Sequence, residues 1–266
     1  MVTKVSFYVV AHADDWQLFM QPNAYNDLMD SVSKVVFIIT TAGDAGGTKA
    51  YWDAREEGCK SSIRFCMAPT TAIMETSGTK EFSHHTITYW SANNAKCYFL
   101  RLPDGNLDGK GFSSNSYQSL GRFRDGQIKT LSAIDGSATY DNWTGFSASL
   151  KSIIEFESNG ITDTTIHYLN PDINTNPNDH ADHVATGHAI MNMAIVSGMR
   201  QILYVGYSVG NRQKNLDSKD LFWKTGMFAA YEKAVYDATD YSTLRESVPT
   251  YLRWSLTMPD FITINP

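Results

Sequence analysis

The chain has 266 residues, of which 42% are hydrophobic, and this is enough to bury one sizeable core. Its formal net charge is −6 and its pI is about 5.6, and no dense run of Lys and Arg argues for a nucleic-acid partner. No apolar run reaches the roughly 18 residues of a membrane helix, and the first residues lack the pattern of an export signal. We therefore expect a soluble protein.

The three cysteines, Cys59, Cys66 and Cys97, are odd in number and match neither a CxxC pair nor a disulfide framework. We expect free thiols in a reducing compartment, the cytoplasm. No repeat or linker divides the chain, so we expect a single domain over 1–266. The oligomeric state stays open, with a homo-oligomer as one option.

Five short runs rich in β-branched and aromatic residues are too apolar to alternate between core and solvent, so they predict buried parallel strands. These runs are Lys4–Val10, Lys34–Thr40, Cys97–Leu102, Thr165–Leu169 and Gln201–Gly206. Segments with helical spacing alternate with them, namely Trp16–Val32, Ala50–Met67, Phe146–Glu157, His183–Met199 and Lys219–Ala238. This alternation predicts an α/β fold: a Rossmann-like, mostly parallel sheet with helices on both faces.

Two regions interrupt the alternation. Glu81–Ser91 alternates polar and apolar residues, which predicts an additional strand or hairpin with His84 and His85 on opposite faces. Asp104–Trp143 is rich in Gly, Ser and Asn, which predicts long loops. Loops of this length in an enzyme usually face the substrate or move.

The first predicted strand runs directly into His12, Asp14 and Asp15. This is the edge at which ligands bind in open α/β sheets, although Asp residues there could also cap the following helix. A second polar cluster, Asn178–His183, follows the fourth strand and should lie at the same edge. Two imidazoles and one carboxylate from these clusters can form the open three-ligand zinc site of hydrolases.

Both clusters resemble the motifs of the PIG-L/LmbE-like family of zinc N-deacetylases, AHPDD and HPDH, which stand here as AHADD and HADH. Three more blocks resemble the family in the same order: TTAGDAGG after the second strand, Arg55-Glu56-Glu57 in the next helix, and LPDGNLDG after the third strand. The resemblance covers about the first two-thirds of the chain. It implies hydrolysis of an N-acyl group, N-acetyl above all, on a small-molecule amino sugar or glycoconjugate.

Position by position, the resemblance implies that His12, Asp15 and His183 hold one zinc ion per chain. Asp14 would be the general base that activates the attacking water. His180 would stabilise the developing oxyanion, for which a cationic imidazole is suited.

The resemblance implies further roles for three residues. Asp182 would orient His180 or tune its pKa. Arg55 and Asp104 match positions that contact substrate, and a guanidinium and a carboxylate both suit the polar groups of a sugar. The alternative for Arg55 and Asp104 is a salt bridge between helix and loop.

The sequence departs from the family pattern where Ala13 and Ala181 replace prolines and where Trp16 follows the Asp pair. Neither change removes a ligand. The changes keep open a rival interpretation, a carbohydrate-binding protein of the same fold that has lost turnover. The intact Asp14 argues against it, because a binding protein needs no free carboxylate beside the metal.

Two other motifs suggest different chemistry. Gly206–Gly210 reads GYSVG, the pattern of a serine-hydrolase elbow with Ser208 as nucleophile, but no histidine follows His188, whereas that fold places its histidine later in the chain. Gly43–Gly47 could cradle a phosphate, but it is not GxGxxG and follows the second strand, which favours a structural turn. The sequence therefore predicts a zinc-dependent amidohydrolase.

Overall fold

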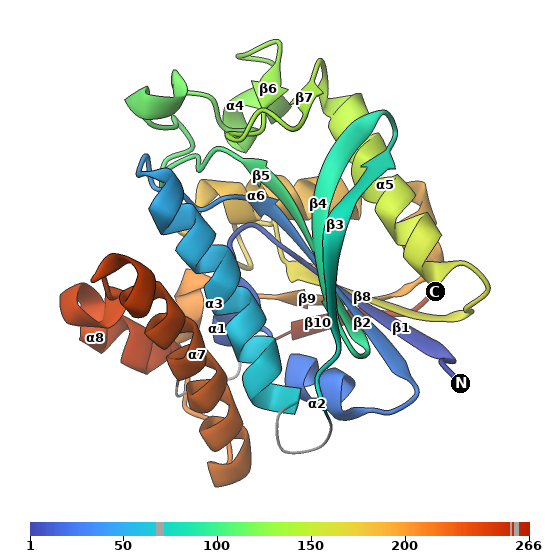
Figure 1. Ribbon diagram of the computed structural model, residues 1–266, viewed down its shortest axis with the longest axis vertical. Coiled ribbons are helices and arrows are strands. Elements are labelled where there is room, and N and C mark those ends of the chain that lie inside the picture. Colours follow the sequence, from blue (N-terminus) through green and yellow to red (C-terminus); the bar gives the residue numbers. More distant parts are fainter. Residues whose placement is uncertain (68–71, 256, 258–260) are drawn as a thin grey trace.

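A mostly parallel sheet forms the centre of the protein in the computed structural model, which describes residues 1–67, 72–255, 257 and 261–266 (Figure 1). In chain order its strands are β1 Lys4–Val10, β2 Ser33–Thr41, β3 Glu75–Phe82, β4 His85–Ala92, β5 Ala95–Leu102, β8 Asp163–Leu169, β9 Arg200–Tyr204 and β10 Phe261–Ile264. Their order across the sheet is β10-β9-β8-β1-β2-β5-β4-β3. The central strands β9, β8, β1, β2 and β5 are parallel, and the outer strands pair antiparallel. The predicted α/β fold is confirmed.

Helices cover both faces of the sheet (Figure 1). In chain order they are α1 Asp15–Phe19, α2 Asn23–Met29, α3 Lys49–Met67, α4 Leu120–Arg124, α5 Trp143–Ser158, α6 Ala181–Met191, α7 Ser218–Thr239 and α8 Thr243–Ser255. Alternate side chains of β1 enter opposite cores, because successive residues of a strand point to opposite faces. Tyr8 and Val10 pack with α1, α2, α3 and α7, whereas Phe7 and Val9 pack with α5 and α6.

The five predicted central strands all lie in the parallel part of the sheet. The predicted excursion at Glu81–Ser91 is part of a hairpin formed by β3 and β4. Ser83 and His84 form its turn with φ of 47° and 67°, as a two-residue turn with two positive φ angles requires. The expectation that both histidines lie in one strand is therefore wrong, since only His85 lies in β4, where its Nδ1 is 3.0 Å from the hydroxyl of Ser149.

The structure also corrects several predicted helices. Trp16–Val32 forms two short helices, α1 and α2, because the chain turns before Pro22, which has no N–H for a helical hydrogen bond. The helix predicted over His183–Met199 ends at Met191 and is followed by a 3₁₀ turn, Ala194–Gly198. Helix α8 and strand β10 were not predicted.

The segment Asp104–Trp143 consists largely of loops, as predicted. It also contains short elements: a 3₁₀ turn Ser113–Asn115, helix α4, and the two-stranded pair β6 Leu131–Ser132 and β7 Thr139–Tyr140. All three cysteines are buried and free of disulfides, as predicted. Within the described part of the chain, every helix is too short or too polar to span a bilayer.

Candidate active site

The carboxyl ends of β1 and β8, which are neighbours in the sheet, bring the two polar clusters together (Figure 1). His12 and Asp15 follow β1 directly, and α1 begins at Asp15. His183 lies in the first turn of α6. His180 caps that helix, since its Nδ1 accepts the backbone N–H of Asp182 at 3.1 Å.

The three predicted metal ligands lie in mutual contact and are buried. His183 Nε2 lies 3.2 Å from His12 Nδ1 and 3.1 Å from Asp15 Oδ1, and the last two atoms are 3.5 Å apart. Ligands bound tetrahedrally to zinc at about 2.0–2.1 Å lie about 3.3 Å from one another. The triangle of ligand atoms therefore fits a metal ion of this size.

Each of the two ligand histidines has a carboxylate behind it. His183 Nδ1 lies 2.9 Å from Asp179 Oδ1, and His12 Nε2 lies 3.4 Å from Asp182 Oδ2. Metal-binding histidines usually pair their second ring nitrogen in this way. The sequence interpretation gave no role to Asp179, which lies in the loop before α6, four residues before His183. It also assigned Asp182 to His180, whose Nδ1 lies farther from the carboxylate, at 3.8 Å.

The carboxylates make this cluster favourable for positive charge. Burial lowers the pKa of His183, but Asp15 and Asp179 outweigh burial and raise it to about 10. Burial opposes charge on His12 too, and Asp15 raises its pKa well above the usual value. Despite burial, the two imidazoles hold the pKa of Asp15 well below its ordinary range. The negative charge of these carboxylates, which stabilises protonated imidazoles, would equally stabilise a metal cation.

His180 differs from the two ligand histidines. Burial, together with the charge of His12, lowers the pKa of His180 to about 4. Because its Nδ1 accepts a backbone N–H, its proton belongs on Nε2, which lies 3.8 Å from Asp104 Oδ1. The structure thus favours a neutral His180 over the predicted cationic imidazole, and a neutral imidazole still offers one N–H donor. Asp104 lies between the two rings, 3.8 Å from His12 Nε2.

Arg55 connects α3 to the loop after β1. Its Nη2 donates to Asp14 Oδ1, its Nε to the hydroxyl of Tyr231 at 2.8 Å, and its Nη1 to the carbonyl of Gly43 at 2.6 Å. Burial is outweighed by the charge of Asp14, which raises the pKa of Arg55 well above its usual value. Arg55 thus forms a salt bridge between helix and loop, which was the alternative to a contact with substrate. A contact of Arg55 with substrate stays a prediction.

The glycine-rich turn Gly43–Gly47 contacts two residues that line the candidate site, Arg55 and Asp104. A Cβ on Gly43 would lie 2.6 Å from the Arg55 guanidinium, and the backbone there has a φ of +58°, so glycine is needed at this position. Asp44 Oδ1 accepts the backbone N–H of Asp104 at 2.9 Å. Both contacts agree with the structural turn that the sequence favoured over a phosphate cradle.

The residue after the Asp pair points away from the site. Trp16 is fully buried, donates from Nε1 to Cys59 Sγ at 3.3 Å, and packs against Phe37. The departure from the family pattern at this position is therefore accommodated in the core beneath α1.

A cavity of about 90 Å³ is lined by two of the predicted ligands, His12 and Asp15, and by Asp14 and His180. Part of its wall comes from three residues after β9 to which the sequence interpretation gave no role: Tyr207, Tyr251 and Trp254. Tyr207 and Trp254 stack with ring centroids 4.7 Å apart. The buried Lys224 donates to the carbonyls of Trp254 at 2.6 Å and Thr257 at 2.7 Å, and so fixes the end of α8 beside the cavity.

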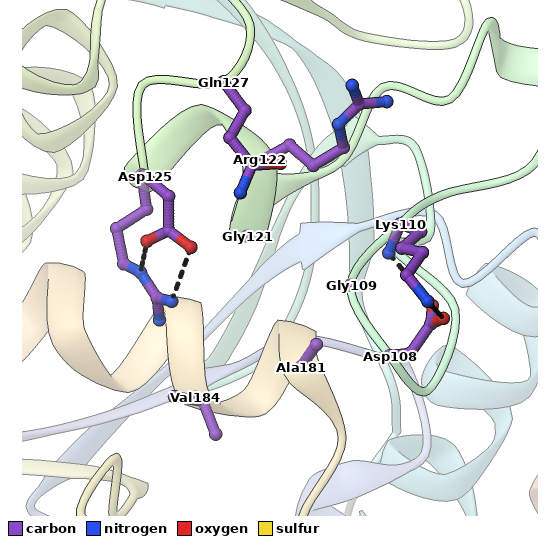
Figure 2. Close-up of a pocket in the computed structure, with 10 residues that line it drawn as sticks. Asp108, Gly109, Lys110, Gly121, Arg122, Asp125, Gln127, Ala181 and Val184 are labelled. Carbon is purple, nitrogen blue, oxygen red and sulfur yellow. Dashed lines mark hydrogen bonds and ion pairs between the residues drawn. The ribbon is translucent and has the colours of Figure 1, made fainter.

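A larger groove of about 360 Å³ borders the first turn of α6 at Ala181 and Val184 (Figure 2). Its charges are largely paired, Asp108 with Lys110 and Asp125 with Arg124, each at 2.7 Å. None of the predicted catalytic or ligand residues lines this groove. The smaller cavity is therefore the candidate active site.

Comparison with known proteins agrees with this geometry. The family model described as PIG-L, GlcNAc-PI de-N-acetylase, matches residues 7–194. Comparison with curated protein sequences gives no match.

Similar solved structures are distant in sequence. The conserved protein TT1542 from Thermus thermophilus is 11% identical over 100% of this chain and 95% of its own, with a TM-score of 0.47. The zinc-inhibited form of teicoplanin deacetylase Orf2 is 11% identical over 88% and 85%, with a TM-score of 0.49. The 4-carboxy-2-hydroxymuconate hydratase GalB from Pseudomonas putida is 9% identical over 99% and 97%, with a TM-score of 0.44. Because the family model spans most of the chain and both polar clusters, the chain belongs to the PIG-L family and is a deacetylase-like hydrolase.

Proposed function

We propose that the protein is a zinc-dependent amidohydrolase that removes an N-acetyl group from an amino-sugar-containing substrate. The observation that carries the proposal is the triangle of ligand atoms from His12, Asp15 and His183, with sides of 3.1 to 3.5 Å. His12 and Asp15 line the same cavity as Asp14. The family description supports an N-acetylated glucosamine unit as the substrate.

The donor set suits zinc, which binds imidazole nitrogen and carboxylate oxygen and keeps one position open in catalytic sites. The orientation of both imidazoles by carboxylates supports this assignment. When bound, zinc would supply a lowered pKa for a water molecule and polarisation of the amide carbonyl. His12, Asp15 and His183 would hold the ion.

Asp14 would take the proton from the attacking water. Arg55 holds Oδ1 of this carboxylate, and among the described residues no hydrogen bond occupies Oδ2. One oxygen is thus fixed in position while the other is available as a proton acceptor.

His180 would donate its Nε2–H to the oxygen that becomes negative as the amide carbon is attacked. A preorganised donor in a buried site stabilises such a charge without reorganisation at the moment of reaction. Asp182 would hold the ring of His180 through its backbone N–H and the ring of His12 through its carboxylate. Asp104 lies beside both rings, where a hydroxyl of the substrate could donate to its carboxylate.

The size of the cavity supports a short acyl group. A volume of about 90 Å³ is smaller than the roughly 150 Å³ cavity that binds benzene in a well-studied protein. An acetyl group fits such a space beside the ligands, whereas a pyranose ring does not. The sugar would therefore lie at the mouth of the cavity.

The test is an assay for free-amine release from a panel of N-acetylated amino sugars, run with the purified protein, after chelation, and after zinc is added back. We expect chelation to abolish release and zinc to restore it. Release that persists without metal would contradict the mechanism. Sugar binding with no release under any condition would favour the rival, a carbohydrate-binding protein of the same fold.

A further inference from the structure

Asp179 is buried next to the predicted metal ligand His183, and both of its carboxylate oxygens have hydrogen-bond partners. Its Oδ1 lies 2.9 Å from His183 Nδ1, and neither side chain is exposed to solvent. The backbone N–H of Tyr207 donates to the same oxygen at 3.1 Å, and Asn176 Nδ2 donates to Oδ2 at 2.7 Å. The carboxylate is thus fixed from the loop before α6 and from the segment after β9.

The approach of this carboxylate depends on Gly206. A Cβ at position 206 would lie 2.3 Å from Asp179 Oδ1 and 2.5 Å from its Oδ2, closer than any real Cβ contact. The φ of Gly206 is −92°, outside the positive range that favours glycine, and the close approach of Asp179 leaves no space for a side chain here. The N–H of Gly206 also donates to Asn176 Oδ1 at 3.0 Å.

These contacts account for the GYSVG segment without a nucleophile. Gly206 gives room to Asp179, and Tyr207 donates to it through the backbone. Ser208 donates from its hydroxyl to Asn176 Oδ1 at 3.3 Å. Residues 206–208 therefore support the loop that carries Asp179.

We propose that Asp179 is a positioning residue of the metal centre, whose carboxylate fixes the tautomer and ring orientation of His183, and that Gly206 provides the space for its approach. With the proton of His183 on Nδ1 and donated to Asp179, the lone pair of Nε2 faces His12 and Asp15. A carboxylate in this position also raises the basicity of the imidazole as a ligand. The inference rests on the proposed function in one respect, the assignment of His183 as a metal ligand.

The first test compares D179N with D172N. Loss of a carboxylate behind a ligand histidine typically weakens metal binding 10- to 100-fold, so we expect the zinc Kd of D179N to rise by about that factor. The d–d absorption of the cobalt-loaded protein should shift, because the orientation and donor strength of His183 change. Asp172 is an exposed residue of the same loop that caps Asn174 and Thr175, so D172N should keep the wild-type Kd and spectrum.

The second test retains every ligand and every carboxylate. G206A should displace Asp179 and weaken zinc binding in the same direction as D179N. G198A is the matched control, because a Cβ at Gly198 meets nothing within 4 Å. The double variant D179N/G206A should lose less than the product of the two single effects, since both act through one carboxylate.

Wild-type zinc affinity and cobalt spectra in D179N and G206A would overturn the proposal and leave Asp179 a purely structural residue. The melting temperature is measured for each variant, and if G206A does not fold, D179N alone decides. Zinc affinity and cobalt spectra are measured without substrate, so the proposed role of Asp179 and the proposed hydrolase function can be contradicted independently. A wild type that binds zinc but releases no amine contradicts only the proposed function, whereas full hydrolysis with unchanged zinc affinity in D179N contradicts only the role of Asp179.

Discussion

Arg55 and Asp14 form a buried ion pair that ties α3 to the loop after β1, directly beside the candidate metal site. The pair joins residues from two separate sequence blocks. It fixes one oxygen of the proposed base, Oδ1 of Asp14. Stability and turnover should therefore both depend on Arg55.

Arg55→Met should lower the free energy of unfolding by about 3–5 kcal/mol, because it leaves the carboxylate of Asp14 buried without its partner. Arg55→Lys keeps the charge but loses the fork geometry that serves Asp14, Tyr231 and Gly43 together, so we expect an intermediate loss. Urea denaturation measures both. Wild-type stability in Arg55→Met would show that the ion pair contributes nothing.

The adjacent carboxylates of Asp14 and Asp15 should respond differently to the same change. Asp14→Asn should retain zinc while kcat falls by about 10²–10⁴, the usual contribution of a general base. Asp15→Asn should lose zinc, because a neutral amide replaces a charged ligand, and added zinc should partly restore its activity. Elemental analysis and steady-state kinetics distinguish the two, and rescue of Asp14→Asn instead would mean that the roles are exchanged.

Lys224 should make stability depend on pH. Burial lowers its pKa from 10.5 to about 7, so between these values the unfolded chain binds a proton that the folded protein does not. The free energy of unfolding should therefore rise with pH across this window, with a slope approaching about 1.4 kcal/mol per pH unit for one proton. Lys224→Met should lack this contribution. Parallel pH profiles of the two proteins in urea denaturation would contradict the shift.

Trp254 should limit the size of the acyl group. Trp254→Ala removes the indole that stacks on Tyr207 at the cavity wall, so we expect kcat/KM for an N-butanoyl substrate to rise about tenfold relative to N-acetyl. Trp143→Ala is the control, because that indole packs in the core on the opposite face of the sheet. If Trp254→Ala keeps the wild-type preference for N-acetyl over N-butanoyl, a residue other than Trp254 limits the size of the acyl group.

Ser208→Ala should retain most activity, because the hydroxyl of Ser208 bonds to Asn176 rather than to a histidine. Loss of one hydrogen bond should cost at most about 1 kcal/mol of stability. Steady-state kinetics and thermal unfolding check this. A fall in kcat by factors of thousands in a folded protein would identify a serine nucleophile.

The parts of the fold that depend on local sequence pattern could be predicted. The central strands are continuous apolar runs, His12 follows β1, and His183 begins the helix after β8. Both the sheet and the meeting of the two clusters therefore followed from the sequence. Helix α8 was not predicted, because much of it faces solvent and it contains Pro249, which interrupts the expected pattern.

Other features depend on tertiary distances that no local pattern encodes. The protonation of His180 follows from its cap bond to Asp182 and its burial beside His12. The role of Asp179 depends on the end of β9, 27 residues farther along the chain at Gly206, which the sequence presented only as part of a misleading serine motif.

The contact between Asp179 and Gly206 has a consequence for the divergence of related proteins. A side chain cannot appear at position 206 while a carboxylate occupies position 179, so the two positions cannot mutate independently. Sequences that carry a larger residue at 206 should have first lost the acid at 179. In an alignment of homologues, sequences with a larger residue at position 206 should therefore lack an acid at position 179.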